Sequence, residues 1–259
     1  NYFSMFGKLG LIFDDCRNMN MRFIRLFSFT CSLLLAIGSA KAVAPPYLID
    51  TNQVWVDSIL NTMTLDEKIG QLFMVAAYSN KDEANYKTID KYINDYKVGG
   101  LIFFQGTAQK QAELTNRYQA QSKIPLWIGF DGEWGLGMRL DNTISYPRQL
   151  VLGAIDQPNL IYKMGTEIAR QMKRIGIHIN FAPVIDVNSN PNNPVINDRA
   201  FGDNKFSVTR KGLAYMQGLQ DHHILASAKH FPGHGDTDVD SHKDLPVLKH
   251  DTKRLESVE

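Results

Sequence analysis

The stretch IPLWIGFD, residues 124–131, does most to decide the fold, because it is a short apolar run that ends directly in a carboxylate. VGGLIFF at 98–104 is a second run of the same kind. Near-continuous apolar runs of this length are typical of buried strands in a parallel sheet. We expect three more strands at 72–77, 176–187 and 223–231.

Helical patterns separate these apolar runs. They predict helices at about 81–96, 107–122, 156–174 and 204–221. A further helix should begin after Thr64, a good N-cap residue, since Asp66 and Glu67 favour the positive end of the helix dipole. The alternation of strands and helices predicts an α/β fold with a helix-covered parallel sheet.

Two parallel architectures fit this alternation. A doubly wound sheet usually carries a glycine-rich phosphate turn, and no G-x-G-x-x-G follows the first strand. In a (β/α)8 barrel, functional residues lie at the carboxyl ends of several strands. Asp131, Asp186 and Lys229-His230 occupy such positions. We therefore favour a TIM-like barrel and expect an incomplete one, with about five of its eight strands present.

The N-terminal residues are expected to lie outside the domain. Residues 1–20 precede a plausible start methionine and indicate an over-extended reading frame. Residues 21–42 have two arginines, an apolar run and the sequence Ala40-Lys41-Ala42, which is typical of a signal peptide and its cleavage site. A membrane anchor is the alternative, although the run is short for a membrane span.

Composition narrows the class of protein. The net charge of +1 over 259 residues argues against a nucleic-acid-binding protein, which usually has a basic excess. Both cysteines, Cys16 and Cys31, precede the expected mature chain from about Val43. That chain would have neither disulfides nor cysteine metal ligands. We expect an exported protein, periplasmic or secreted, without a stable membrane span after the signal is removed.

The segment FDGEWGLGMRL, residues 130–140, is the first candidate for function. Asp131, Glu133 and Arg139 can form charge-assisted hydrogen bonds with the hydroxyls of a polyol. Gly132, Gly135 and Gly137 should allow the backbone to approach a ligand closely. A loop with a surface salt bridge is the alternative.

Residues 180–204 form the second candidate. They follow the fourth expected strand and predict a long irregular loop, which in a compact domain is usually functional. Arg199, flanked by Asp198 and Asp203, is the best ligand-binding residue in it. A structural ion pair explains Arg199 equally well.

The third candidate is AKHFPGHGDTDVDSHKDLPVL, residues 228–248. Lys229 and His230 should point toward the mouth of the barrel. Asp240 and His242 are two positions apart and face the same side of an extended chain, so Asp240 can orient the imidazole. Such a pair is a good general acid and base, and nearby glycines would let it move as a lid.

A metal site is the rival interpretation of this segment. Its potential ligands are His230, His234, Asp236, Asp238, Asp240 and His242. Histidine and carboxylate side chains do bind zinc and manganese. The spacing, however, matches no H-E-x-x-H or comparable template.

KHFPGHGDTDVDSHKDLP resembles the signature of glycoside hydrolase family 3, in its bacterial exo-β-N-acetylglucosaminidase branch. TLDEKIGQLFMV, VGGLIFF, FDGEWGLGMRL and the loop at 180–204 resemble other segments of that family in the same order. The resemblance implies that 43–259 is the N-terminal part of a catalytic barrel. It also implies a retaining enzyme that releases terminal β-linked N-acetylglucosamine from cell-wall or glycan fragments.

The resemblance carries site roles onto particular residues. His242 would be the acid/base and Asp240 its partner, in place of the carboxylate that most retaining glycosidases use. Asp131, Arg199, Lys229, His230 and Arg139 would bind the sugar, and no metal or organic cofactor is implied. Asp186 would support the loop.

The nucleophile of the family is an aspartate on a later strand. We therefore expect the 259 residues alone not to hydrolyse a β-glycoside. Two alternatives stay open. One is a β-glucosidase or β-xylosidase of the same family, whose members generally lack the dyad. The other is a non-catalytic sugar- or metal-binding protein.

Overall fold

A computed structural model describes residues 53–248 and 250–258. The expected over-extended segment and signal peptide, residues 1–42, lie outside the described residues. The chain divides into two compact units, Asn1–Ser58 and Ile59–Glu259, and helix α4 (Gln53–Thr62) begins in the first. In the described ranges, no helix has both the length and the apolar character that a membrane span requires.

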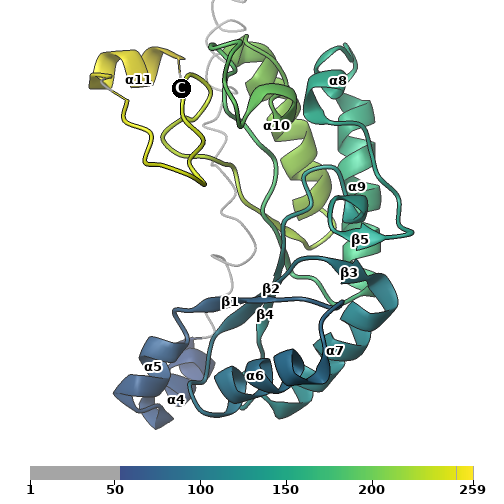
Figure 1. The fold of residues 1–259 in the computed structure, drawn as a ribbon, viewed down its shortest axis with the longest axis vertical. Coiled ribbons are helices and arrows are strands. Elements are labelled where there is room, and N and C mark those ends of the chain that lie inside the picture. The colour runs from purple at the N-terminus through teal and green to yellow at the C-terminus, as the bar shows by residue number, and fades with distance from the viewer. Residues whose placement is uncertain (1–52, 249, 259) are drawn as a thin grey trace, which may run out of the picture. The chain divides into compact units, whose positions relative to one another are not determined.

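A five-stranded parallel sheet forms the centre of the second unit. Its strands are β1 (Met74–Ala77), β2 (Gly100–Phe103), β4 (Trp127–Phe130), β6 (Ile179–Asn180) and β7 (Leu225–Ala226). They lie side by side in chain order (Figure 1). A doubly wound sheet reverses its strand order, whereas the wall of a barrel does not. The order confirms the TIM-like arrangement that the sequence predicts.

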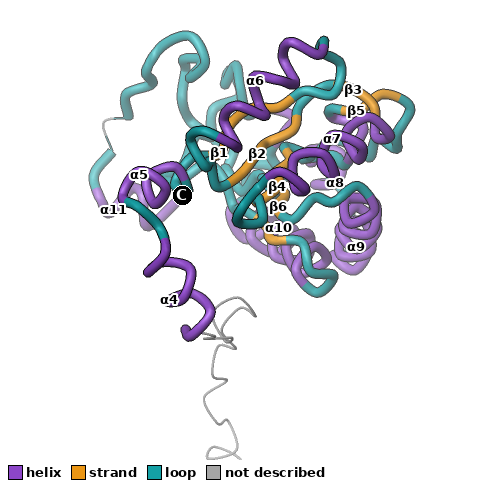
Figure 2. Tube along the Cα trace, turned by 90° about the horizontal axis from the view of Figure 1, so that it is seen from below, coloured by secondary structure: helices purple, strands orange, loops and turns teal. Residues whose placement is uncertain are grey.

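Helices follow the strands and cover one face of the sheet. They are α6 (Glu83–Asn94), α7 (Ala108–Gln121), α9 (Pro158–Arg174) and α10 (Lys205–Gln220), close to the expected ranges (Figures 1 and 2). Under them, Leu101, Phe103, Ile128 and Phe130 are fully buried. Trp127 lies on the opposite face of the sheet from Ile128, because side chains alternate along a strand, and it is half exposed.

Helices α9 and α10 pack against each other through glycines. A Cβ atom on Gly218 would lie 3.0 Å from the Cα of Gly165, which leaves no space for a side chain at this contact. Ile161, Ile168 and Met172 form the buried stripe of α9. The close contact fixes the two helices that flank β6, and therefore the loops that leave this strand.

Short elements complete the unit. Helix α5 (Leu65–Gly70) begins with a capping box between Thr64 and Glu67, which confirms the predicted start. The others are β3 (Gly106–Thr107), β5 (Leu140–Asp141), α8 (Gln149–Gly153), α11 (Thr252–Val258) and the 3-10 helices η1 (Leu136–Met138) and η2 (Asn197–Arg199). Strands β3 and β5 pair in parallel and were not expected.

The fourth and fifth strands are shorter than the apolar runs suggested. Pairing of β6 with β7 ends at Asn180, and only an isolated bridge between Val184 and Lys229 follows it. Pro183 has no N–H to donate to a ladder. The side chain of Gln149 takes the place of a strand, because it accepts from the Val184 N–H and donates to the Val184 carbonyl.

Candidate active site

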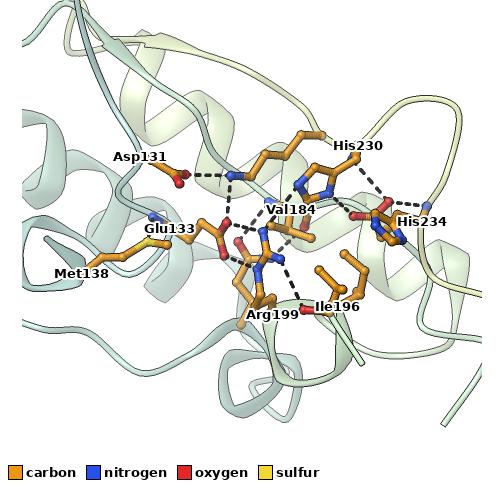
Figure 3. A network of polar contacts seen from close by, with 12 residues as sticks. Asp131, Glu133, Met138, Val184, Ile196, Arg199, His230 and His234 are labelled. Atoms are coloured by element: carbon orange, nitrogen blue, oxygen red, sulfur yellow. Dashed lines mark hydrogen bonds and ion pairs between the residues drawn. The ribbon is translucent and has the colours of Figure 1, made fainter. Parts of the chain in front are cut away.

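Charged side chains converge beyond the carboxyl ends of β4, β6 and β7 (Figure 3). Asp131 follows β4 directly, and Lys229 and His230 follow β7. Asp186 and Arg199 come from the loop after β6. We call the set Asp131, Glu133, Arg139, Asp186, Arg199, Lys229 and His230 the charged cluster.

Lys229 joins two carboxylates of the charged cluster. Its Nζ lies 2.7 Å from Asp131 Oδ1 and 2.8 Å from Glu133 Oε1. Arg139 pairs with the other oxygen of Asp131 and also donates to the Asp131 carbonyl. Both cations therefore hold Asp131 on the rim of the sheet, where the sequence placed it.

Arg199 is paired with Glu133, a contact that the sequence did not indicate. Its Nε and Nη2 donate to the two oxygens of Glu133 at 2.9 and 2.7 Å. Of the two flanking aspartates, Asp198 pairs with Arg148. A planar guanidinium and a carboxylate match in this two-bond geometry, which fixes the orientation of the side chain.

Asp186 orients His230. Its Oδ2 lies 2.6 Å from His230 Nδ1, and its Oδ1 accepts from the backbone N–H groups of His230 and His234. A carboxylate at Nδ1 favours the proton there, so Nε2 faces away from it. His230 Nε2 lies 3.4 Å from Arg199 Nη2. The expected supporting role of Asp186 thus extends to the imidazole itself.

Exposure separates the charged cluster into two groups. The side chains of Glu133 and Asp186 are 0% and 1% exposed. The five residues expected to bind sugar keep 15–33% of their side chains exposed: Asp131, Arg139, Arg199, Lys229 and His230. The exposed group can reach a ligand, and the two buried carboxylates hold it in place.

Asp131 and Glu133 stay ionised. Burial opposes this, but the charges of Lys229 and Arg139 outweigh it and lower the pKa of Asp131. Arg199 and Lys229 likewise lower the pKa of Glu133 despite its burial. Anionic carboxylates accept hydrogen bonds and do not donate protons, so neither group suits the role of general acid near neutral pH.

Asp240 and His242 form the expected dyad. Asp240 Oδ1 lies 2.8 Å from His242 Nδ1 and also accepts from the His242 backbone N–H at 2.9 Å. These bonds, the backbone one first, lower the pKa of Asp240. The His242 side chain is 77% exposed. A ring held at Nδ1 and open to solvent at Nε2 can exchange protons with a bound molecule.

The dyad has no direct polar contact with the charged cluster in the described part of the chain. His234 lies between them, because its backbone N–H donates to Asp186 and its Nε2 lies 3.0 Å from Ser241 Oγ. Sequence reasoning placed His234 only among possible metal ligands. The polar sequence around His234 did not indicate that this residue is buried.

Most of the potential metal ligands of this segment pair with other side chains. His234 contacts Thr237 and Ser241, while Asp236 pairs with His250 at 2.5 Å and with Arg254 at 3.1 Å. Within residues 53–248 and 250–258, no group of three or more histidine, cysteine or acidic side chains is arranged to hold a metal ion.

The glycines of residues 130–140 leave room for the protein rather than for a ligand. A Cβ atom on Gly137 would lie 2.7 Å from Ser145 Cβ, and one on Gly135 would lie 2.9 Å from the ring of Tyr146. Gly135 also has a positive φ of 85°, which favours glycine. The expectation that these glycines face a ligand is therefore corrected.

Tyr215 is a further residue that the sequence did not indicate. It lies on α10, is fully buried, and its hydroxyl lies 3.2 and 3.1 Å from the carbonyl oxygens of Gly132 and Glu133. It supports the turn that carries Asp131 and Glu133. Its distance of 83 positions from Gly132 in the chain explains why no local pattern reveals it.

Known proteins match this chain over most of the described residues. The family model "Glycosyl hydrolase family 3 N terminal domain" matches residues 64–259. "Beta-hexosaminidase A" of Pseudoalteromonas piscicida is 39% identical over 180 residues, covering 64% of this chain and 30% of its own. "Beta-N-acetylglucosaminidase/beta-glucosidase" of Cellulomonas fimi is 31% identical over 201 residues, covering 77% of this chain and 35% of its own.

A solved structure agrees with these matches. The glycoside hydrolase family 3 β-N-acetylglucosaminidase from Paenibacillus sp. str. FPU-7 aligns with a TM-score of 0.69 at 35% identity. The alignment covers 76% of this chain and 38% of that one. This chain therefore spans about a third of the length of these two curated relatives, 30% and 35%.

Proposed function

Because the chain belongs to glycosyl hydrolase family 3, we propose that its charged cluster and dyad serve a retaining, exo-acting β-N-acetylhexosaminidase. The substrate would be a terminal β-linked N-acetylglucosamine on a cell-wall or glycan fragment. The names of the matched relatives support this activity. The Asp240–His242 pair is the observation that carries it, because it supplies an exposed imidazole that can donate a proton, which the ionised Asp131 and Glu133 cannot do.

The geometry favours separate roles for the charged cluster, which would bind the sugar, and for the dyad, which would transfer the proton. The exposed members of the charged cluster offer charge-assisted hydrogen bonds to sugar hydroxyls: Asp131, Arg139, Arg199, Lys229 and His230. His242 gives its Nε2 proton to the glycosidic oxygen as the bond breaks and later takes a proton from the attacking water. Asp240 holds the ring and stabilises its charged form. We assign the nucleophile to none of the described residues.

Asp131 is proposed as a hydroxyl acceptor rather than a nucleophile. Lys229 and Arg139 both pair with it, and these contacts occupy one position on each of its oxygens. A nucleophile needs a free oxygen aimed at the anomeric carbon. Remaining acceptor positions on the same oxygens suit hydroxyl groups.

The test uses the complete gene product with aryl β-N-acetylglucosaminides that differ in leaving group. His242→Ala should slow hydrolysis of poor leaving groups by about 10²–10⁴-fold and affect activated ones much less, because activated leaving groups need no proton. An equal loss for both classes would contradict the acid role.

A β-glucosidase is the second candidate, because the name of the Cellulomonas fimi relative includes both activities. Comparison of aryl β-glucosides with aryl β-N-acetylglucosaminides distinguishes the two. Sugar binding without hydrolysis of either would favour a non-catalytic sugar-binding protein.

We also propose that the protein is exported to the periplasm or secreted, where cell-wall fragments occur. The pattern at 21–42 supports this, with Ala40-Lys41-Ala42 as the cleavage site. N-terminal sequencing of the protein recovered from its source should begin near Val43. An intact N-terminus on membrane-bound protein would favour an anchor instead.

A further inference from the structure

His234 connects the charged cluster with the loop that carries the dyad. Only 8% of the residue is exposed, and its ring lies edge-on to His230 with 5.8 Å between ring centroids (Figure 3). Its backbone N–H donates to Asp186 Oδ1 at 2.8 Å. Asp186 also orients His230, so the two histidines share one buried support.

Several contacts fix the position of the His234 ring. Asn193 Nδ2 donates to the His234 carbonyl at 2.7 Å and to Thr237 Oγ1 at 3.2 Å. The Thr237 hydroxyl donates its proton to the same carbonyl, so Thr237 Oγ1 accepts from His234 Nδ1, 2.5 Å away. In the neutral ring, Nε2 is therefore an acceptor, and the Ser241 hydroxyl can donate to it.

The contact with Ser241 is the one that ties the dyad to the buried part of the protein. Within the described ranges, the other hydrogen bonds of residues 240–242 stay within 240–244. Ser241 stands between Asp240 and His242 in the chain. Loss of its bond to His234 would leave both members of the dyad on a largely exposed segment.

We propose that His234 is a positioning residue that holds the Asp240–His242 dyad at the sugar site through its hydrogen bond with Ser241. The inference rests on the proposed function of the dyad. Through Asp186, the same residue is anchored to His230. Asp186 thus helps to position both His230 in the sugar site and, through His234, the proton donor His242.

Substitutions can separate the two sides of His234. His234→Asn keeps an amide near the Nδ1 position, for Thr237, and removes the group that meets Ser241. His234→Gln places an amide near the Nε2 position. Ser241→Ala removes the other partner. Thr88→Ala on α6 is the matched control, since among the described residues the exposed Thr88 hydroxyl bonds only to a carbonyl of its own helix.

Kinetics of the complete gene product give the first measurement. His234→Asn and Ser241→Ala should each lower kcat for poor leaving groups by about 3- to 10-fold, as expected for one hydrogen bond, with KM little changed. His234→Gln should recover part of the loss. The double variant should be no slower than either single one, because both remove the same contact. Equal losses for good and poor leaving groups would overturn the proposal.

Hydrogen exchange of the loop gives a measurement that needs no activity. Peptides within 238–248 should exchange about 3- to 10-fold faster in both single variants, and at the normal rate in Thr88→Ala. Unchanged exchange in both variants overturns the proposed contact, whatever the substrate. Faster exchange in a protein whose wild type hydrolyses no glycoside supports the contact and rejects the proposed function, so the two failures are distinguishable.

Discussion

Glu133 and Arg199 face each other in two parallel hydrogen bonds, although 66 positions separate them in the chain. The Glu133 side chain is completely buried, while Arg199 keeps an exposed edge. The buried carboxylate of Glu133 therefore fixes the orientation of the partly exposed Arg199 guanidinium. Lys229 contacts the same carboxylate, so a single side chain organises two of the expected sugar-binding cations.

Glu133→Gln should destabilise the protein strongly. An amide keeps the shape but leaves Arg199 and Lys229 without their anionic partner, and breaking a buried ion pair costs about 3 kcal/mol or more. Urea denaturation at neutral pH measures the free energy of unfolding. Glu113→Gln is the control: its pair with Lys110 on α7 is exposed, and its loss should have little effect on the free energy of unfolding. Similar losses in both variants would contradict the central role of Glu133.

Because of the charged cluster, the free energy of unfolding should decrease at acidic pH. The pKa values of Asp131 and Glu133 are lowered in the folded state. Their contribution to stability is complete above the unfolded pKa values, about 4, and is lost as the pH falls through the lower folded values.

Lys229→Met removes a cation that both carboxylates contact. Their folded pKa values should rise toward the unfolded ones, so the loss of stability in acid should be smaller and should end at higher pH than in the wild type. Urea denaturation at several pH values between about 7 and 3 measures the shift. Parallel curves for variant and wild type would show that Lys229 does not control these groups.

Tyr215→Phe and Tyr118→Phe form a matched pair of buried substitutions. The Tyr215 hydroxyl contacts the carbonyls of Gly132 and Glu133, and its removal should cost about 1 kcal/mol. The buried Tyr118 hydroxyl has no hydrogen-bond partner among the described residues, so its removal should be neutral or stabilising. Thermal and urea unfolding of both variants provide the comparison, and equal destabilisation would refute the role of Tyr215 in supporting the turn.

Asp240→Asn tests the dyad from the carboxylate side. The amide can no longer stabilise a charged imidazole, so turnover of poor leaving groups should fall by roughly 10²-fold or more. Activated aryl glycosides should be affected much less. Asp238→Asn, two positions earlier on the same exposed loop, is the control and should retain activity. Equivalent effects at 238 and 240 would argue for a general effect of loop charge.

The order of strands and helices could be predicted from the sequence because each element has a local pattern. Apolar runs at 98–104 and 124–131 and the cap at Thr64 are signals of this kind. The Asp240–His242 contact was also predictable, since two positions of chain separate its members. The roles of Glu133 and Tyr215 were not, because their partners lie 66 and 83 positions away.

Local pattern also misled where side chains replace backbone pairing. The apolar run at 176–187 suggested a long strand, yet the ladder stops at Asn180, whose side chain bonds both backbone groups of Gly132. The side chain of Gln149 then forms hydrogen bonds with the backbone N–H and carbonyl of Val184. Hydrophobic periodicity cannot reveal either replacement of a backbone partner by a side chain, because it indicates which residues are buried and not which group supplies a hydrogen bond.

The bond between Lys229 and Asp131 joins positions 98 apart. Contacts of such long sequence separation carry a large closure entropy and tend to form late in folding. A saccharide that requires both residues can recognise only chains whose five strands have already assembled. It would therefore act as a pharmacological chaperone for the whole unit, and the melting temperature would climb with saccharide concentration.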